Sequence, residues 1–116
     1  MEEPRQRATA IVIRDDSLLI VKDSRLRSYS LPGGGIDTVE LPISAVAREL
    51  HEETSLLARK ISYLFTFRGK HNEHHVYRVD ADGDVKINGE IEDFMWWDRQ
   101  SRVPIFPHVL DIISKL

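Results

Sequence analysis

The spacing of apolar and polar positions changes several times along the chain, and each change marks an expected element. Short runs rich in β-branched and aromatic residues, bounded by turn residues, predict β-strands. We expect strands over residues 8–13, 18–21, 61–67, 75–79 and 92–97. Asp15, Asp16 and Ser17 lie between the first two runs, so we expect these two strands to form a hairpin.

Apolar residues three and four positions apart predict a helix over residues 42–54. Its expected buried stripe consists of Ile43, Val46, Ala47, Leu50 and Thr54. Pro42 suits the first helical position, where the N–H that it lacks is not needed. A final helix is expected after Pro104 and Pro107, with an apolar face made by Val109, Ile112, Ile113 and Leu116. This order of elements predicts an α/β fold, with helices covering a mixed sheet, as a single domain over residues 1–116.

Composition and charge limit the classes of partner and of chemistry that this chain can have. The chain has 116 residues and a formal net charge of −3, so it lacks the basic field that duplex nucleic acid or an anionic membrane would need. The absence of cysteine excludes disulfides, thiolate zinc sites and cysteine nucleophiles. The first residues lack the apolar core of a signal peptide, and no apolar run approaches membrane-spanning length. We therefore expect a cytoplasmic protein.

Three consecutive glycines, Gly33, Gly34 and Gly35, precede the predicted helix. Glycine loses more backbone entropy on ordering than any other residue, which disfavours it inside regular elements. We therefore expect a tight turn here, or a place where the backbone closely approaches another group.

Three glutamates distinguish the polar face of the predicted helix. Glu49, Glu52 and Glu53 stand at positions i, i+3 and i+4, where like charges repel by about 0.2–0.5 kcal/mol per pair. They also lie in the C-terminal half of the helix, where its dipole disfavours anions. Two interpretations remain open at this point: a solvated acidic face, or a site for Mg²⁺ or Mn²⁺, which prefer clustered oxygen ligands.

These glutamates belong to a longer pattern that resembles the Nudix box. The box reads Gly, five residues, Glu, seven residues, Arg-Glu, an aliphatic residue, any residue, Glu-Glu, any residue, Gly and an aliphatic residue. The residues that match are Gly34, Glu40, Arg48, Glu49, Leu50, Glu52, Glu53 and Leu56. Ser55 stands where the box has its second glycine, and the resemblance implies that this position ends the helix in a left-handed conformation. Since that conformation costs a residue with a Cβ roughly 1 kcal/mol, we expect Ser55→Gly to raise thermal stability.

The resemblance implies the family's α/β/α sandwich and Mg²⁺-dependent hydrolysis of a nucleoside diphosphate linked to another group, with Mn²⁺ as an alternative cation. By position, Glu49, Glu52 and Glu53 are the expected metal ligands, joined by a backbone carbonyl near Gly34 or Gly35. Arg48 is expected to act in catalysis with Glu52 and Glu53, by orienting Glu52 or its neighbours rather than by touching substrate. Glu40 is expected either to brace the loop against the helix or to lie in solvent. Glu53 is the first candidate for the general base, and the alternatives are Glu90, Glu92 and Asp93.

Gly34 and Gly35 are candidates for substrate contact, and further candidates lie outside the box. The cationic side chains that could reach phosphates are Arg25, Arg27, Arg68 and Lys70, each of which could instead be merely exposed. Trp96 and Trp97 point to opposite sides of their strand, so one could stack on a base while the other joins the core. We favour Trp96 for stacking. His71, His74 and His75 lack the spacing of a zinc site and could line the substrate mouth.

Two functions remain in competition. The first is a hydrolase whose partner is a small phosphorylated molecule. The second is a nucleotide-binding module of the same fold that senses its ligand without turnover. In this family, a proline at a characteristic offset past the box indicates ADP-ribose as the substrate, and a tyrosine there indicates dinucleoside polyphosphates. Neither residue is present at that offset in this chain. This absence favours a simple or modified nucleoside triphosphate. The chain is compatible with a homodimer.

Overall fold

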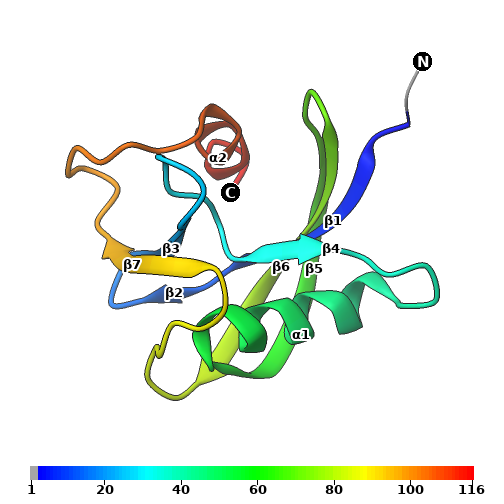
Figure 1. The fold of residues 1–116 in the computed structure, drawn as a ribbon, viewed down its shortest axis with the longest axis horizontal. Coiled ribbons are helices and arrows are strands. Elements are labelled where there is room, and N and C mark those ends of the chain that lie inside the picture. The colour runs from blue at the N-terminus through cyan, green and yellow to red at the C-terminus, as the bar shows by residue number, and fades with distance from the viewer. Residues whose placement is uncertain (1–2) are drawn as a thin grey trace.

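The computed structural model describes residues 3–116 as two β-sheets with a helix on either side (Figure 1). The strands are β1 (Arg5–Ile11), β2 (Ile13–Arg14), β3 (Ser17–Asp23), β4 (Gly33–Gly35), β5 (Leu57–Arg68), β6 (Asn72–Asp82) and β7 (Ile91–Trp97). The helices are α1 (Pro42–Thr54) and α2 (Pro107–Ile113). Within residues 3–116, no helix is both long and apolar enough to cross a membrane.

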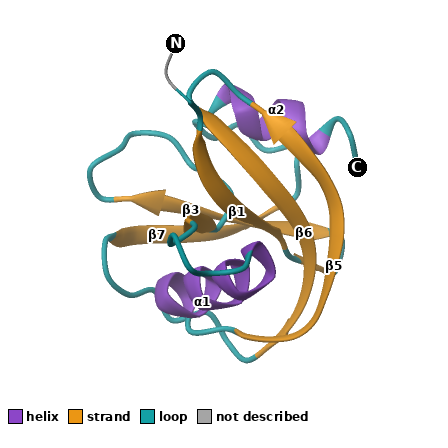
Figure 2. Ribbon diagram, turned by 90° about the vertical axis from the view of Figure 1, so that its right-hand side faces the viewer, coloured by secondary structure: helices purple, strands orange, loops and turns teal. Residues whose placement is uncertain are grey.

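The larger sheet is mixed and has the strand order β4-β1-β6-β5. β1 and β6 are parallel, whereas β4 and β5 run antiparallel to their neighbours. The smaller sheet is antiparallel, with the order β2-β3-β7. Figure 2 shows α1 on the concave side of the curved β5–β6 pair, with α2 at the other end of the molecule. The predicted α/β class with a mixed sheet covered by helices is confirmed.

Two apolar clusters hold these layers together. Ala8 and Ala10 on β1 belong to the cluster that includes Val46 and Leu50 of α1. The second cluster joins α2 to both sheets through Ile11, Leu18, Ile20, Val76, Trp97, Val109 and Ile112. Because side chains alternate along a strand, β1 contributes to both clusters and lies between the two helices.

The expected hairpin between the first two apolar runs is only partly formed. Ile13 pairs with Leu18 and Arg14 with Ser17, but β1 leaves this hairpin to join the larger sheet. The change of sheet occurs at Val12, which lies between β1 and β2. A continuous apolar run therefore serves two sheets, a distinction that its hydrophobicity alone does not encode.

The expectation of a turn at the three glycines is wrong, because they form β4, which pairs with β1 at the edge of the larger sheet. Gly33 has φ of 148°, and a Cβ there would lie 2.1 Å from the carbonyl oxygen of Ala8. The extended conformation is retained because these residues allow a close approach that a side chain would prevent.

The predicted stripe of α1 needs correction at its N-terminal end. Val46, Leu50 and Thr54 are buried as expected, but Ile43 is 43% exposed, and Ala45 is buried in its place. α1 packs on β1, β4 and β5, so its buried face is set by where these strands lie. The spacing of apolar residues predicts which face of a helix is buried only to within about one residue.

α1 ends at Ser55, whose backbone is left-handed with φ of 67°. The hydroxyl of Ser55 donates a hydrogen bond to the carbonyl of Lys86 at 2.8 Å and accepts one from the Asn88 side-chain amide at 2.7 Å. The backbone N–H of Asn88 also donates to the carbonyl of Glu53 at 3.1 Å. The serine therefore attaches the loop between β6 and β7 to the end of α1, which offsets the gain expected from glycine.

This arrangement predicts different effects for two substitutions of Ser55. Ser55→Ala keeps the left-handed strain and removes both hydroxyl hydrogen bonds, so we expect a loss of about 1 kcal/mol in the free energy of unfolding. Ser55→Gly loses the same bonds but relieves about 1 kcal/mol of strain, so it should be more stable than the alanine variant. Urea denaturation of the three proteins tests this order. An alanine variant as stable as the glycine variant would contradict it.

His74 is a buried titratable residue at the junction of β1 and α2. Its Nδ1 lies 2.9 Å from the Thr9 hydroxyl, and its ring stacks on His108 with 5.1 Å between ring centroids. Burial, the largest cause, and the neighbouring His108, Arg7 and His75 together lower the pKa of His74 to about 4. The ring is therefore neutral in the folded protein at pH values where an exposed histidine is protonated.

His74 is expected to make the folded protein sensitive to acid. Between pH 6.5 and pH 4 the unfolded chain binds a proton that the folded chain excludes, so stability falls as pH falls through this window. At about 1.4 kcal/mol per pKa unit, we expect a loss of about 2 kcal/mol between pH 6.5 and 4.5. Urea denaturation across this range measures it. His74→Gln should have a shallower pH dependence, whereas His51→Gln, an exposed control, should match the wild-type slope.

Candidate functional site

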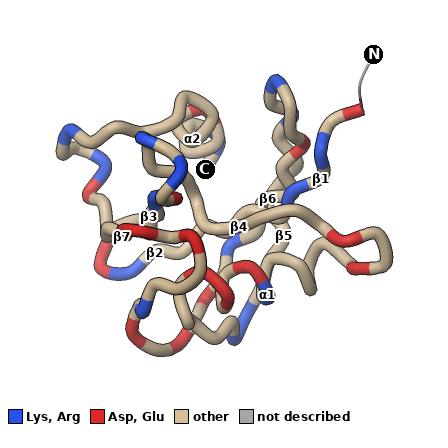
Figure 3. The backbone as a smooth tube through the Cα atoms, in the orientation of Figure 1, with Lys and Arg blue, Asp and Glu red and all other residues tan. Residues whose placement is uncertain are grey.

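The carboxylates of α1 line a cavity of about 230 Å³, here called the acidic cavity. Its walls come from the C-terminal half of α1, the end of β3 and the loop before β7. The residues that line it are Asp23, Glu49, Glu52, Glu53, Asn88, Gly89, Glu90 and Ile91. Figure 3 shows acidic positions around α1, in the loop before β7 and on β7 itself. All three glutamates singled out by the sequence therefore face one cavity.

Glu53 is held by the glycine strand. Its Oε1 accepts a hydrogen bond of 2.9 Å from the backbone N–H of Gly33. Burial raises the pKa of Glu53 to about 7; the Gly33 hydrogen bond opposes this shift, and the nearby charge of Glu49 adds to it. The carboxyl is thus oriented by the backbone in a place where a negative charge is poorly solvated.

Glu49 is positioned by the absence of a side chain at Gly34. A Cβ at Gly34 would lie 2.3 Å from Cδ of Glu49 and within 2.6 Å of both its carboxylate oxygens. No side chain can occupy that space without displacing the carboxylate. Gly34 therefore contributes to the acidic cavity by allowing α1 to approach β4.

Arg48 connects the loop before α1 to the glutamates. Its guanidinium donates two hydrogen bonds to Glu40, at 2.7 and 2.8 Å, and a third to the carbonyl of Gly35 at 3.2 Å. Its Nη1 also lies 3.0 Å from Glu49 and 3.2 Å from Glu52. Arg48 lowers the pKa of Glu40 to about 2. Glu40 thus lies against the helix, and the Gly35 carbonyl that was a candidate metal ligand contacts Arg48.

The donor chemistry of the acidic cavity fits a hard divalent cation. Glu49, Glu52, Glu53 and Asp23 supply carboxylate oxygens on one surface, which suits Mg²⁺ or Mn²⁺. In the part of the chain that the structure describes, no three acidic or histidine side chains are grouped closely enough to form a ligand set. Glu49 and Glu52 are instead paired with Arg48, so a cation would have to draw them away from this partner.

The alternative proton acceptors lie in ion pairs or hydrogen bonds. Glu90 lines the acidic cavity and pairs with Arg25 at 2.6 Å, while Arg25 also binds Asp23 at 2.8 Å. Glu92 pairs with Lys22, and Asp93 accepts a hydrogen bond from the hydroxyl of Tyr29. The Asp93 hydrogen bond raises the pKa of Tyr29 to about 12. Of the three acids, only Glu90 lines the acidic cavity.

The remaining candidates lie in several places. Arg27 is exposed, while Arg68 and Lys70 line a separate cavity with His71. The guanidinium of Arg14 covers the ring of Trp96 at 5.2 Å from its centroid, and Trp97 is buried with its Nε1 donating to the carbonyl of Ser101. The tryptophans do face opposite clusters, but Trp96 lies away from the acidic cavity.

The structure adds residues to the site that the sequence pattern did not single out. Asp23 closes the acidic cavity from the end of β3, and Asn88 closes it from the loop before β7. Arg7 on β1 places its Nη2 3.4 Å from the carbonyl oxygen of Gly33. The alternation Arg7-Ala8-Thr9-Ala10 could have assigned Arg7 to the face opposite α1, whereas Asp23 carries no such signal.

The fold is similar to those of solved Nudix hydrolases. A nudix hydrolase family member from Chromobacterium violaceum is 33% identical, with a TM-score of 0.89 over 99% of this chain and 77% of that chain. A MutT NUDIX hydrolase from Burkholderia pseudomallei is 23% identical and superimposes with a TM-score of 0.88 over 99% of both chains. The latter likeness is one of fold.

Similarity to curated proteins is more local. A protein named "Probable DHNTP pyrophosphohydrolase" from Lactococcus lactis is 33% identical over 57 residues, covering 49% of this chain and 34% of that protein. An 8-oxo-dGDP phosphatase from Danio rerio is 27% identical over 108 residues, covering 85% of this chain and 33% of that protein. The chain thus spans about a third of the length of these relatives.

The NUDIX domain family model matches residues 4–108, which include both sheets, α1 and the start of α2. This match covers far more of the chain than the box alone, and the fold agrees with it. The chain belongs to the Nudix family.

Proposed function

We propose that this chain hydrolyses a phosphoanhydride bond in a nucleoside diphosphate linked to a further group, with a simple or modified nucleoside triphosphate as the substrate class. The observation that carries the proposal is the gathering of Glu49, Glu52, Glu53 and Asp23 on one cavity. Two relatives are named as a probable DHNTP pyrophosphohydrolase and an 8-oxo-dGDP phosphatase, and these names support this class.

The proposed cation is Mg²⁺, with Mn²⁺ as a substitute, held by Glu49, Glu52 and Glu53. When bound, such a cation supplies positive charge against the phosphate oxygens and favours ionisation of the attacking water. Asp23 is a further oxygen donor on the same wall.

The protein residues have separate proposed roles. Glu53 is our first candidate to accept the proton from water, because the Gly33 N–H fixes the orientation of its carboxyl group. Arg48 positions Glu49 and Glu52, and Glu40 holds Arg48 in place. Glu90 is the alternative proton acceptor, since it faces the same cavity.

We propose further that residues 1–116 act as one domain in the cytoplasm, as a monomer or a homodimer. No partner other than a small phosphorylated molecule is proposed for the acidic cavity.

Substitution of the glutamates tests the hydrolase assignment. Glu52→Gln and Glu53→Gln each keep the side-chain size but remove an anionic ligand, so we expect kcat to fall by roughly 10²–10⁴-fold with the fold retained. The assay is phosphate or pyrophosphate release from a panel of nucleoside triphosphates and sugar nucleotides with Mg²⁺. Removal of Mg²⁺ with EDTA should stop turnover, and Mg²⁺ or Mn²⁺ should restore it.

The control is Asp80→Asn, an exposed carboxylate on β6 that lies outside the acidic cavity. It should turn over at the wild-type rate, and thermal melting should show that all variants fold. Near-normal kcat in both glutamine variants would reject the metal assignment. A loss in Glu90→Gln that matches the loss in Glu53→Gln would leave the proton acceptor undecided between them.

The ion pairs of Arg48 favour a second candidate, a nucleotide-binding module without turnover. Arg48 occupies carboxylate oxygens of Glu49 and Glu52 that a cation would need. In the described part of the chain, no three acidic or histidine side chains form a ligand set. Nucleotide binding by calorimetry, with no hydrolysis of any member of the panel at saturating Mg²⁺, would support this module over the enzyme.

A further inference from the structure

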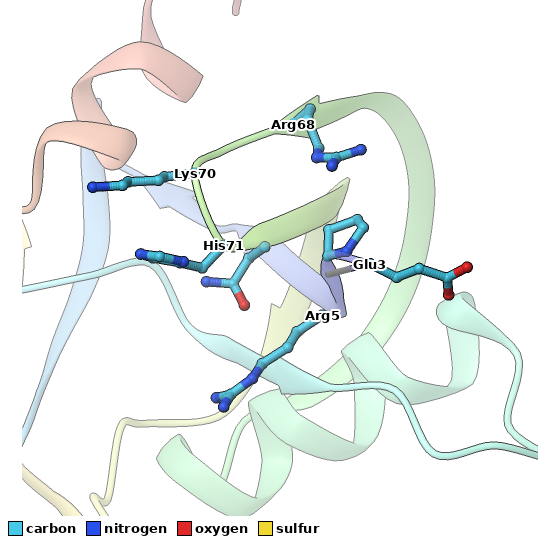
Figure 4. Close-up of a pocket in the computed structure, with 7 residues that line it drawn as sticks. Glu3, Arg5, Arg68, Lys70 and His71 are labelled. Carbon is cyan, nitrogen blue, oxygen red and sulfur yellow. The ribbon is translucent and has the colours of Figure 1, made fainter. Parts of the chain in front are cut away.

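A second cavity, of about 420 Å³, lies at the tip of the β5–β6 hairpin beside the start of β1. Arg5, Arg68, Lys70, His71 and Asn72 contribute to its walls, and we call it the basic cavity. Figure 4 shows Arg5, Lys70 and His71 extending to one side of the hairpin, while the guanidinium of Arg68 and the carboxylate of Glu3 point to the other. The cationic side chains of Arg5 and Lys70 thus lie on one side of this cavity, although the whole chain carries a net charge of −3.

The backbone of the basic cavity is fixed. The N–H of Arg5 donates to the carbonyl of His71 at 3.0 Å, and the N–H of Gly69 donates to the carbonyl of Asn72 at 2.8 Å. Arg5 is also paired with Asn72 in the parallel ladder of β1 and β6. Lys70 therefore lies in a hydrogen-bonded hairpin turn, and Arg5 lies on a strand of the larger sheet.

The cations of the basic cavity are weakly neutralised. Arg68 lies 3.7 Å from Glu73 and remains 61% exposed. Among the ion pairs of residues 3–116, none includes Arg5 or Lys70. Uncompensated cations around a concave surface focus a positive potential, which attracts and orients anions.

β1 runs from the basic cavity toward the glycine strand β4, on which Glu53 is held. Arg5 and Arg7 lie on the same face of β1, and at about 3.3 Å per residue their backbones are about 7 Å apart. The guanidinium of Arg7 lies 3.4 Å from the carbonyl of Gly33, whose N–H holds Glu53. Arg5 and Arg7 therefore lie in order along β1, between the hairpin tip and the strand β4 whose Gly33 N–H binds Glu53.

We propose that the basic cavity binds a phosphate group carried by the substrate at a position remote from the anhydride that is cleaved. The substrate class is then a nucleotide that bears an additional phosphate monoester. The link to substrate rests on the proposed function, whereas the binding of phosphate by the cavity does not require turnover.

The first experiment measures anion binding without catalysis. Full-length ¹⁵N-labelled protein is titrated with inorganic tripolyphosphate in EDTA, so that no divalent cation is present. We expect amide shifts at Arg5 and at residues 70–72, and an affinity about tenfold lower in the double variant Arg5→Gln/Lys70→Gln. Lys60→Gln, an exposed cation at the opposite end of β5, is the matched control and should keep the wild-type affinity.

Equal affinity in the double variant would overturn the phosphate site. An equal loss in Lys60→Gln would also overturn it, because it would show nonspecific attraction to surface charge. Thermal melting of each variant establishes that the fold is retained.

The second experiment compares a nucleoside 5′-triphosphate with the same nucleotide carrying a 3′-phosphate, in Mg²⁺. We expect the wild type to have a several-fold lower KM for the 3′-phosphorylated substrate, and the double variant to lose this preference through KM. Turnover of both substrates with the same KM in the wild type would overturn the remote-phosphate assignment alone. No turnover by any protein, with the tripolyphosphate result as expected, would reject the proposed hydrolase and retain the phosphate site.

Discussion

The close approach of β4 to α1 is the constraint on which the acidic cavity depends. A helix beside a strand normally keeps the distance set by the side chains between them, but Gly33 and Gly34 present none. The carboxylate of Glu49 occupies the space where a side chain of Gly34 would lie, and the N–H of Gly33 reaches Glu53 at 2.9 Å. Because β4 is an edge strand on β1, this contact also fixes the site to the larger sheet.

The charges of the glutamates on α1 are balanced in different ways. Glutamates on one helical face repel one another, and Arg48 relieves that repulsion by contacting Glu49 and Glu52 while Glu40 holds it from the loop. Glu53 has the Gly33 N–H in place of this cation, and its burial disfavours the charged form. The three glutamates therefore differ in environment although the sequence presents them as equivalent.

Local patterns in the sequence predicted much of the fold, and they failed where distant contacts decide. The 3.6-residue period located α1 and its buried Val46 and Leu50, since the apolar residues on the buried face of a helix recur with the helical period. The entropy cost of glycine predicted either a turn or a close backbone approach at Gly33–Gly35. Only the close approach is confirmed, because the benefit of glycine there comes from Ala8 and Glu49, which are remote in sequence. The break at Val12 was missed for a similar reason, since the apolar run over residues 8–13 is continuous, whereas only its first part pairs with β6. Within the site, the box located the glutamates, whereas Asp23 reaches the acidic cavity only through the fold.

Ser55 shows how a departure from the family pattern is compensated locally. The left-handed geometry that favours glycine is retained, and the hydroxyl group gains contacts with Lys86 and Asn88 that glycine could not make. Asn88 lines the acidic cavity and also binds the carbonyl of Glu53, so the serine couples the loop before β7 to the end of the catalytic helix proposed here. A strained backbone position thus becomes a point of attachment for a cavity wall. The shape of the acidic cavity in this chain therefore depends on a residue at which the chain differs from its family.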